Sequence, residues 1–516
     1  MRWVLIRPRN HSPYYDPEIQ EPLGLEYLAA SRQARGDAVL VLDGAISGSS
    51  DVKVARRAAS FEPDVIGFSV MTAQEAPSVR AIHSELTLAV DGRRVGYVAG
   101  GNLVSTEPEN ADRLLPRPML LVRNEGEAEL DEIAKSWAAG ESDETERVRA
   151  GRTVAEIDRL PFPLRPFASQ ILGSGWAFNL QGSRGCCGGC RHCASPGMTS
   201  TGRNRWRGRS PAGIVDEIEE LKTSFGAESF NFVDEDFLGP NAHAAERARD
   251  FAGELRKRKH KISFGIQVRP DSLSDEIVET LTDVGLVYVF VGVESDDPED
   301  FRRWGRPWTA DPYRFVDRLR ERGAEVNAGV MLFHSHSTFE GIRRFARKLA
   351  AHRLLEYRSA INRQDAMPGS RLYREAAEAG LIDPMTPGPQ HVPFVNPGIE
   401  EFRRDLLVAL GPLGPPSMEA LCSLPPLLSS RYHDSRFSPL CHELMRIISH
   451  LDEATVETFF ALLDAHEKGT CTLEYVSEMQ RKNLEVATSG AEELAGKGFA
   501  RSFEELREAI RIDAKV

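Results

Sequence analysis

The chain lacks long apolar runs and an excess of positive charge. Its longest apolar stretches, such as 286-LVYVFVGV-293, have the length of a strand, well short of the roughly 18 to 20 residues that a membrane helix needs. The formal net charge is -13 at pH 7, with acidic and basic residues interleaved. We therefore expect neither a membrane span nor a nucleic-acid or anionic-membrane partner.

An export signal is missing and cysteine is scarce. The start, 1-MRWVLIRP-8, runs into a strand-like segment without the pattern of a signal peptide, so we expect a cytoplasmic protein. There are seven cysteines in 516 residues, and in a reducing cytosol a cluster of them favours metal or redox chemistry over a disulfide framework. Cys422, Cys441 and Cys471 lie in helix-like surroundings, where we expect buried, inert thiols.

Residues 1–145 alternate strand-like runs with amphipathic helical ones. The strand-like runs are 3-WVLI-6, 39-VLVLDG-44, 64-DVIGFSV-70, 95-VGYVAGG-101 and 119-MLLVRNEGE-127. This alternation predicts an α/β domain with a doubly wound parallel sheet. Such sheets bind ligands at the carboxyl ends of their strands. The predicted ligand edge is therefore Ser69 to Gln74, Gly100 to Val104 and Glu125 to Glu127.

A polar and Pro-rich segment, residues 146–170, is predicted to be a linker. Residues 171–385 then repeat the alternation with longer helices, and strands are expected at 176–182, 229–235, 261–268, 286–294, 325–333 and 355–362. Six strand-helix units predict a partial (β/α)6 barrel of the TIM type, with functional groups at the carboxyl ends of its strands. Residues 386–516 are expected to form a C-terminal α-helical domain, with helices near 437–466 and 473–498.

The stretch 182-GSRGCCGGCRHC-193 holds four of the seven cysteines. Three thiolates from one short loop bind three irons of a cubane cluster and leave the fourth iron open to a substrate. Spacing alone allows two sets, in which Cys190 and Cys193 are joined by either Cys186 or Cys187. A structural zinc site, with Cys187 or His192 as fourth ligand, is the alternative.

The C-x3-C-x2-C pattern, placed after the first strand of a six-unit strand-helix array, resembles the radical S-adenosylmethionine (radical SAM) superfamily over residues 160–385. The resemblance implies a 4Fe-4S cluster on Cys186, Cys190 and Cys193, with Cys187 outside the set. It further implies that the open iron chelates the amino and carboxylate groups of SAM. Reductive cleavage then gives a 5'-deoxyadenosyl radical, with an electron from a reduced flavodoxin or ferredoxin.

Other strand ends match the same superfamily and supply candidate SAM contacts. The predicted contacts are Asp234, Glu235 and Asp236 in 230-FNFVDEDF-237, Arg269 in 267-QVRPD-271, and Glu294 and Ser295 in 292-GVES-295. The first three acids suit the ammonium group of SAM, and the arginine suits its carboxylate. The natural partner of Glu294 is a ligand hydroxyl or Arg269. The alternatives are solvated helix caps for the first three acids, and a structural salt bridge between Arg269 and Glu294.

With this neighbour, the first domain resembles the cobalamin-binding domain that precedes many radical SAM enzymes. The resemblance rests on 22-PLGLEYLAA-30, 64-DVIGFSVMT-72, 98-VAGGN-102 and 122-VRNEGEAEL-130. The cobalamin contacts that it implies are Ser69, Met71, Thr72, Gln74, Gly100, Gly101, Asn102, Glu125, Gly126 and Glu127. No D-x-H-x-x-G motif occurs, and Asn102 and Asn124 stand where the family commonly has histidine and glycine.

These resemblances imply a cobalamin-dependent radical SAM methyltransferase acting on an unactivated carbon of a small metabolite of the natural-product type. Two alternatives stay open: radical dehydration, epimerisation or ring rearrangement with a vestigial first domain, and a zinc-stabilised module without catalysis. His334 and His336 in 331-MLFHSHST-338 follow the fifth strand. They are candidates for an acid or base near neutral pH, or ordinary polar loop residues.

Overall fold

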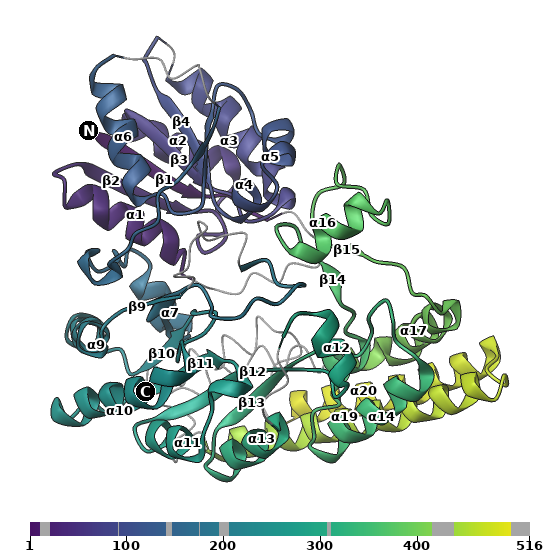
Figure 1. Cartoon of the computed structure of the whole chain (residues 1–516). Coiled ribbons are helices and arrows are strands. Elements are labelled where there is room, and N and C mark those ends of the chain that lie inside the picture. Colours follow the sequence, from purple (N-terminus) through teal and green to yellow (C-terminus); the bar gives the residue numbers. More distant parts are fainter. Residues whose placement is uncertain are drawn as a thin grey trace. The chain divides into compact units, whose positions relative to one another are not determined.

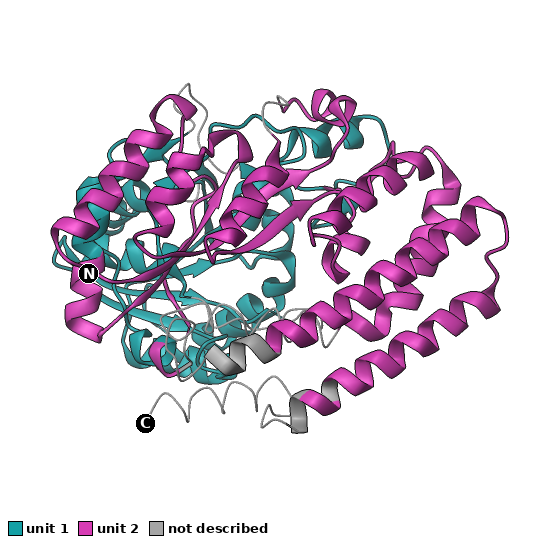
Figure 2. Cartoon of the chain, turned by 90° about the horizontal axis from the view of Figure 1, so that it is seen from below, with its two compact units in different colours: residues 1–171, 179–217, 366–390 teal, residues 172–178, 218–365, 391–516 magenta. Residues whose placement is uncertain are grey.

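The structure is a computed structural model that describes residues 1–10, 21–90, 92–140, 147–174, 176–195, 206–306, 311–414 and 438–496. Figure 2 shows its two compact units: unit 1 comprises residues 1–171, 179–217 and 366–390, and unit 2 residues 172–178, 218–365 and 391–516. The chain passes between the units several times, so they differ from the predicted domains, whose boundaries at 145, 170 and 385 stay predictions. Among the described residues, no helix is both long and apolar enough to span a membrane.

Unit 1 is built on a six-stranded parallel sheet with the order β2-β1-β3-β4-β5-β6 (Figure 1). Its strands are β1 (Arg2–Arg7), β2 (Ala38–Asp43), β3 (Val65–Ser69), β4 (Gly96–Gly100), β5 (Leu120–Arg123) and β6 (Val148–Ala150). Its helices are α1 (Leu23–Gln33), α2 (Asp51–Ser60), α3 (Ala76–Ala89), α4 (Asn102–Thr106), α5 (Pro108–Leu114) and α6 (Glu127–Ala138). The strand order reverses between β1 and β3, the point where such sheets bind ligands.

Helices cover both faces of this sheet because successive strand side chains point to opposite faces. Val4 and Ile6 of β1 belong to a core with α2, α3 and α5, whereas Trp3 and Leu5 belong to a core with α1 and α6. The predicted doubly wound architecture is confirmed. One strand was missed: β6 lies in a segment read as polar linker, yet it pairs in parallel with β5. Its three residues, Val148 to Ala150, are too few to give a strand pattern.

Unit 2 contains most of a second sheet, with the order β13-β12-β11-β10-β7, in which the pairs β10–β11, β11–β12 and β12–β13 are parallel. Its strands are β7 (Phe178–Leu180), within which the chain passes from unit 2 to unit 1, β10 (Ser229–Phe232), β11 (Ser263–Val268), β12 (Leu286–Glu294) and β13 (Glu325–Val330). The helices along it are α9 (Pro211–Phe225), α10 (Asn241–Lys257), α11 (Asp275–Thr282), α12 (Pro298–Arg303), α13 (Pro312–Glu321) and α14 (Phe339–Ala351). This alternation of strands and helices agrees with the predicted partial barrel.

The sixth strand, predicted at 355–362, is not formed there. Residues 357–361 are a short helix, α15 (Tyr357–Ile361), which begins with a capping box between Glu356 and Ser359. The parallel ladder beyond β13 is a single bridge between Phe333 and Arg363. The local cap therefore prevails over the apolar alternation of the segment.

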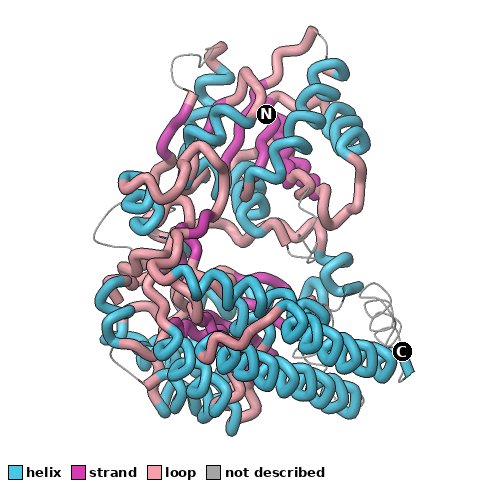
Figure 3. The backbone as a smooth tube through the Cα atoms, turned by 90° about the vertical axis from the view of Figure 1, so that its right-hand side faces the viewer, coloured by secondary structure: helices cyan, strands magenta, loops and turns pink. Residues whose placement is uncertain are grey.

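The C-terminal part of unit 2 is helical, as predicted (Figure 3). It consists of α17 (Pro397–Leu410), α19 (Ser438–Glu467) and α20 (Leu473–Gly496), which pack on one another, while α19 also packs on α14 and α15. The sequence reading missed α17, which opens on Pro397 behind an Asn396 cap within a Pro-rich stretch. Cys422 lies outside the described residues.

The remaining elements are short. They are α7 (Ala168–Ser174), β8 (Ser183–Arg184), β9 (Arg207–Gly208), β14 (Asp365–Ala366), α16 (Arg371–Glu378), β15 (Gln390–His391), and the 3-10 turns η1 (Ala73–Glu75), η2 (Ile157–Arg159), η3 (Pro270–Ser272) and η4 (Gly411–Leu413).

Candidate functional site

The cysteine loop follows β7 and is held at its start by the antiparallel pair of β8 and β9. Cys186, Cys187, Cys190 and Cys193 are all half-buried. The N–H of Gly188 donates to Sγ of Cys186 at 3.2 Å, a contact that stabilises a thiolate. Four sulfur donors in a tight loop with backbone N–H support suit an iron–sulfur cluster.

Helix α16 fixes the middle of this loop within unit 1. The N–H of Leu372 donates to the carbonyl of Arg191 at 2.8 Å. The Arg191 guanidinium also pairs with Glu375, whose pKa is lowered despite some desolvation because Arg371 and Arg191 both bind its carboxylate. The loop conformation is therefore set by a second segment far away in the sequence.

Arginines of the β8–β9 pair bind two carboxylates that the sequence assigned to cobalamin. Arg184 binds Glu127 at 2.7 Å and Glu125 at 3.4 Å, and Arg207 binds Glu125. Burial alone would raise the pKa of Glu125, but the bond from Arg207 and the charge of Arg184 lower it overall. These two carboxylates thus join the end of β5 to the strands beside the cysteine loop. Gly126 between them packs against Leu28, to which a Cβ would approach within 3.3 Å.

The loop after β3 presents side chains at the point where the sheet order reverses. Ser69 is half-buried, whereas Met71 is 46% exposed and Thr72 and Gln74 are also exposed. The amide of Asn10, after β1, donates to Oγ1 of Thr72 at 3.1 Å and so bridges the two strand ends on either side of the reversal. An apolar thioether beside hydroxyl and amide groups suits a large, flat ligand with polar substituents, and corrin is such a ligand.

Behind this loop, Glu75 shapes the backbone. The N–H of Met71 donates to Oε2 of Glu75 at 2.6 Å. Burial raises the pKa of Glu75 to about 7, although bonds from the backbone at Met71 and Thr72 act against the rise. The buried carboxyl group of Glu75 therefore fixes the backbone of the loop that carries the exposed side chains.

The ends of β4 and β5 have unusual backbone conformations. Gly101 has φ of 102°, and a Cβ there would lie 2.6 Å from the carbonyl oxygen of Val70, so only glycine lets the ends of β3 and β4 meet. Asn124 has φ of 62° and its N–H donates to Oγ of Ser105 at 2.9 Å. Asparagine is the side chain that best replaces glycine in this left-handed region, which explains its place here. The Oδ1 atoms of Asn102 and Asn124 are buried without a hydrogen-bond partner among the described residues.

The sheet of unit 2 has one apolar and one polar face. Val287, Val289, Val291 and Val293 of β12 are buried beneath helices, while Tyr288, Phe290, Gly292 and Glu294 alternate with them on the other face. The register places Asn327 beside Phe290, Gly329 beside Gly292, and Asn231 beside Gly265 on this second face. A face with glycines and polar side chains beside two aromatic rings leaves room for a ligand rather than for a packed apolar core.

Glu294 ends β12 with φ of 64°, in the left-handed region, next to a shift of register between β12 and β13. Its carboxylate pairs with Arg306 at 3.0 Å, and Arg306 also donates to the carbonyl of Gly292 at 3.0 Å. Burial raises the pKa of Glu294, and the charge and hydrogen bond of Arg306 oppose this rise. A Cβ on Gly292 would lie 2.6 Å from Oε1 of Glu294, so the glycine makes room for the pair.

A strained backbone, a register shift and a half-buried ion pair at one strand end are the features of a functional position. The sequence indicated Glu294 but not Arg306. Arg306 lies after α12, away from any strand end, and no motif marks it.

The predicted acids after β10 differ from one another in the structure. Asp234 and Asp236 are fully buried, whereas Glu235 is exposed. Nε of Arg269 donates to Asp236 at 2.9 Å, and the same guanidinium reaches Asp271 at 3.1 Å. Burial raises the pKa of Asp236 to about 6, even with Arg269 beside it. Arg269 thus pairs with Asp236 and Glu294 with Arg306, which corrects the alternative of a salt bridge between Arg269 and Glu294.

The two candidate histidines also differ. His334 is buried and its Nε2 lies 3.2 Å from Oδ2 of Asp300, which also accepts from the hydroxyl of Ser295 at 2.7 Å. Desolvation acts to raise the pKa of Asp300, but His334 and Ser295 lower it overall. This group ties the end of β12 to α12 and the loop after β13. His336 is exposed, with Nδ1 3.2 Å from the Ser335 hydroxyl.

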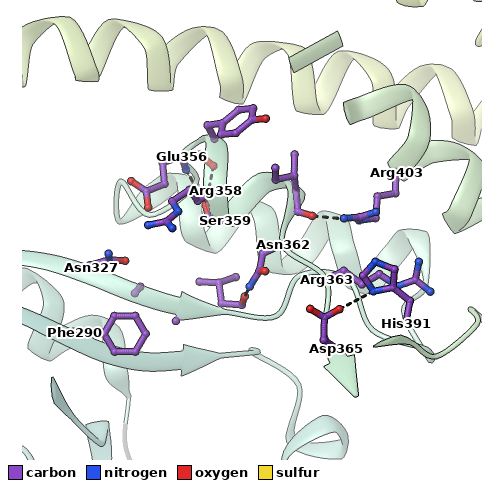
Figure 4. Close-up of a pocket in the computed structure, with 15 residues that line it drawn as sticks. Phe290, Asn327, Glu356, Arg358, Ser359, Asn362, Arg363, Asp365, His391 and Arg403 are labelled. Carbon is purple, nitrogen blue, oxygen red and sulfur yellow. Dashed lines mark hydrogen bonds and ion pairs between the residues drawn. The ribbon is translucent and has the colours of Figure 1, made fainter. Parts of the chain in front are cut away.

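A pocket of about 490 Å³ lies against the polar face of the sheet, beside β12 and β13 (Figure 4). Phe290 and Asn327 contribute from the two strands, and the Asp365–His391 pair, at 2.6 Å, lies at its other side. Its lining includes the arginines Arg358, Arg363 and Arg403, the imidazole of His391, and the acids Glu356 and Asp365. The pocket is large enough for a small metabolite.

Comparison with known proteins agrees with this geometry. The radical SAM superfamily model matches residues 180–349, and the B12 binding domain model matches residues 17–134. An uncharacterised methyltransferase of Pyrococcus horikoshii is 24% identical over 387 residues, which cover 70% of this chain and 79% of the relative.

Two solved structures share the fold. The cobalamin-dependent S-adenosylmethionine radical enzyme OxsB, with aqua-cobalamin bound, superposes with a TM-score of 0.76 at 16% identity, covering 99% of this chain and 83% of the other. The radical S-adenosylmethionine methyltransferase TsrM of Kitasatospora setae, with cobalamin and a [4Fe-4S] cluster bound, gives a TM-score of 0.59 at 19% identity, covering 73% and 75%. The chain therefore carries a B12 binding domain, matched over residues 17–134, ahead of a radical SAM domain, matched over residues 180–349.

Proposed function

We propose that the protein is a cobalamin-dependent radical SAM methyltransferase that methylates an unactivated carbon of a small metabolite. One observation carries the proposal: a B12 binding domain and a radical SAM domain follow each other in one chain, and the second contains the cysteine loop. When bound, the reduced cluster and SAM supply a 5'-deoxyadenosyl radical, and cobalamin carries the methyl group. The methyltransferase name of the Pyrococcus relative supports the same reaction class.

We assign the cluster to Cys186, Cys190 and Cys193. The N–H bond from Gly188 to Cys186 stabilises a charged sulfur at that position, which agrees with this register. Cys187 is then the spare thiol. Gly188 and Gly189 give the loop the freedom to wrap around the inorganic core.

We assign SAM to the polar face of the sheet in unit 2. Glu294, fixed by Arg306 and by its strained backbone, offers a carboxylate in a set orientation, which suits a hydroxyl or ammonium group. Glu235 is the exposed acid after β10. Asp234, Asp236, Arg269 and Ser295 act by positioning, because they are buried or bound to neighbouring residues.

We assign cobalamin to the edge of the sheet in unit 1, on Ser69, Met71, Thr72 and Gln74. Gly100, Gly101 and Asn102 form the adjoining strand end. The loop after β5 contains Glu125, Gly126 and Glu127. Its two carboxylates are held in place by Arg184 and Arg207. The pocket beside β12 and β13 is our candidate for the substrate.

Each methylation would need two external electrons, one to form the radical from SAM and one to return cobalamin to the state that accepts a methyl group from SAM. We propose a reduced flavodoxin or ferredoxin of the cytoplasm as their source. Radical dehydration, epimerisation or rearrangement is the competing function, because it uses the same radical without methyl transfer.

The test is anaerobic incubation of the reconstituted protein with SAM, reductant and hydroxocobalamin across a panel of metabolites. Methylation produces 5'-deoxyadenosine and S-adenosylhomocysteine together, with one methyl group gained by the substrate. Substrate-dependent 5'-deoxyadenosine without S-adenosylhomocysteine would support the competing function instead. Stoichiometric zinc in place of iron and sulfide would rule out both.

A further inference from the structure

The helical part of unit 2 brings three different metal-binding side chains together. Asp405 lies on α17, His466 near the end of α19, and Cys471 in the turn before α20. One ligand atom from each lies within 4.8 Å of the other two. Nε2 of His466 is 3.1 Å from Oδ2 of Asp405, and Sγ of Cys471 is 3.9 Å from the same oxygen. The three donors therefore converge on one point.

The two spacings to Oδ2 of Asp405 fit a tetrahedral zinc ion. Bonds of about 2.3 Å to sulfur, about 2.0 Å to nitrogen and about 2.1 Å to oxygen place adjacent ligand atoms about 3.4 to 3.6 Å apart. The observed distances of 3.1 and 3.9 Å differ from this by a few tenths of an ångström. Thiolate, imidazole and carboxylate together are a zinc donor set, and the thiolate and carboxylate charges balance the dication.

The surroundings hold the donors in place. The His466 ring lies between Phe402, with centroids 5.4 Å apart in an edge-on contact, and Phe339, stacked at 6.5 Å. Phe402 itself is fully buried. The side chains of His466 and Asp405 keep 11% and 14% exposure, so an ion can enter from solvent. Rigid, partly apolar support with a solvent path is the environment of a protein metal site.

We propose that Asp405, His466 and Cys471 bind a zinc ion that ties α17 to the turn between α19 and α20. Water takes the fourth position next to the three protein donors found among the described residues. This site is separate in sequence from the cysteine loop and independent of the methyltransferase assignment. The competing interpretation is an Asp405–His466 ion pair with an adjacent thiol that binds no metal.

The test uses the full-length protein with its iron–sulfur cluster loaded, incubated with zinc chloride and freed of excess metal. We expect zinc to be retained at one ion per chain, measured by mass spectrometry of the elements. Asp405→Asn and Cys471→Ala should each weaken zinc retention by at least about tenfold. His450→Ala, an exposed histidine on the same helix, is the matched control and should keep the zinc.

X-ray absorption at the zinc edge identifies the atoms bound to zinc. It uses the unmodified protein, so the result does not depend on whether the variants fold. One sulfur at about 2.3 Å with nitrogen and oxygen neighbours at about 2.0 to 2.1 Å is expected. Three or four sulfur neighbours would place the zinc in the cysteine loop and overturn the proposal. So would an unmodified protein that retains no zinc, or folded Asp405→Asn and Cys471→Ala proteins that retain it fully.

Discussion

At the C-terminal end of β5 the chain turns at Asn124 with φ of 62°, and at the C-terminal end of β12 it turns at Glu294 with φ of 64°. Asparagine adopts this conformation readily, so the first turn needs little support beyond the Ser105 bond. Glutamate does not, and the second turn is supported by a register shift and by Arg306. Nearly equal φ angles therefore have different free-energy costs at the two turns. The higher cost, at Glu294, marks the position at which the side chain itself matters.

We expect the largest change in ligand affinity when the Glu294 carboxylate is removed. Glu294→Ala deletes the group that we assign to SAM and leaves Arg306 without its acid. We expect SAM affinity to fall on the order of 100-fold, measured by calorimetry on the cluster-loaded protein. Asn124→Gly is the control and should bind SAM as the unmodified protein does. Unchanged SAM affinity in a cluster-loaded Glu294→Ala protein would contradict the assignment.

A glycine at the same position separates strain from charge. Glu294→Gly adopts positive φ at no steric cost, so it should be more stable than Glu294→Ala by about 1 kcal/mol. It should still bind SAM as poorly as Glu294→Ala. Recovery of SAM affinity in Glu294→Gly would mean that the backbone turn, and not the carboxylate, matters.

At the sheet of unit 1, we expect a smaller loss of ligand affinity, because the side chains that we assign to cobalamin are exposed. The double variant Met71→Ala, Thr72→Ala removes the thioether and hydroxyl at the reversal point of the sheet in unit 1. Cobalamin affinity should fall about tenfold, since a packing contact and one hydrogen bond are lost. Titration with hydroxocobalamin, followed by absorbance, measures it. Thr87→Ala on the exposed side of α3 is the control, and an equal loss there would remove the site from this edge.

The Asn124 turn itself gives the next test. Asn124→Val forces a β-branched side chain into the left-handed region at a cost of about 1 to 2 kcal/mol. The melting temperature should fall by several degrees, while Asn124→Gly leaves it unchanged or raises it. A valine variant as stable as the asparagine protein would show that the turn rearranges, and would break the parallel with Glu294.

A third group of acids lies where the acidic side chains outnumber the arginines that face them, and the pKa values of these acids are raised. Burial, with Glu356 and Glu325 nearby, raises the pKa of Asp452 to about 8, and burial raises that of Glu356 to about 6. The folded protein then holds protons that the unfolded chain releases above about pH 4, so its stability falls as pH rises from about 4 to about 8. Arg320 is the cation facing this group, across a pocket between α19 and the start of β13.

The expected effect is the smallest of the series: a melting temperature a few degrees lower at pH 8.5 than at pH 5.5. Asp452→Asn should reduce this difference, whereas Glu474→Gln, an exposed acid on α20, should not. Calorimetry at the two pH values measures it. A melting temperature that rises between these values in the unmodified protein, and is unaltered by Asp452→Asn, would refute the expected loss of stability with rising pH.

The sequence predicted the features that repeat along the chain. Alternating apolar runs indicated the strands of both sheets, and glycine or polar residues at their ends indicated the ligand edges, because parallel strands place their carboxyl ends together. The cysteine loop was readable from spacing and position. Glu294 was indicated because a carboxylate ended an apolar strand.

What the sequence did not predict depends on partners far away in the chain. Arg306 forms an ion pair with Glu294, and Arg184 and Arg207 form ion pairs with Glu125. No local sequence pattern encodes these contacts. Residues 357–361 looked like a strand until a local cap made them helical. Cys471 was expected to be an inert thiol, yet Asp405 and His466 lie beside it.

The most direct test of the cluster assignment compares two neighbouring thiols. Cys186→Ala and Cys187→Ala proteins are reconstituted anaerobically with iron and sulfide, and the iron content and the 5'-deoxyadenosine formed from SAM are measured together. We predict that Cys187→Ala keeps both and that Cys186→Ala loses both. Loss in Cys187→Ala with retention in Cys186→Ala would contradict the assignment.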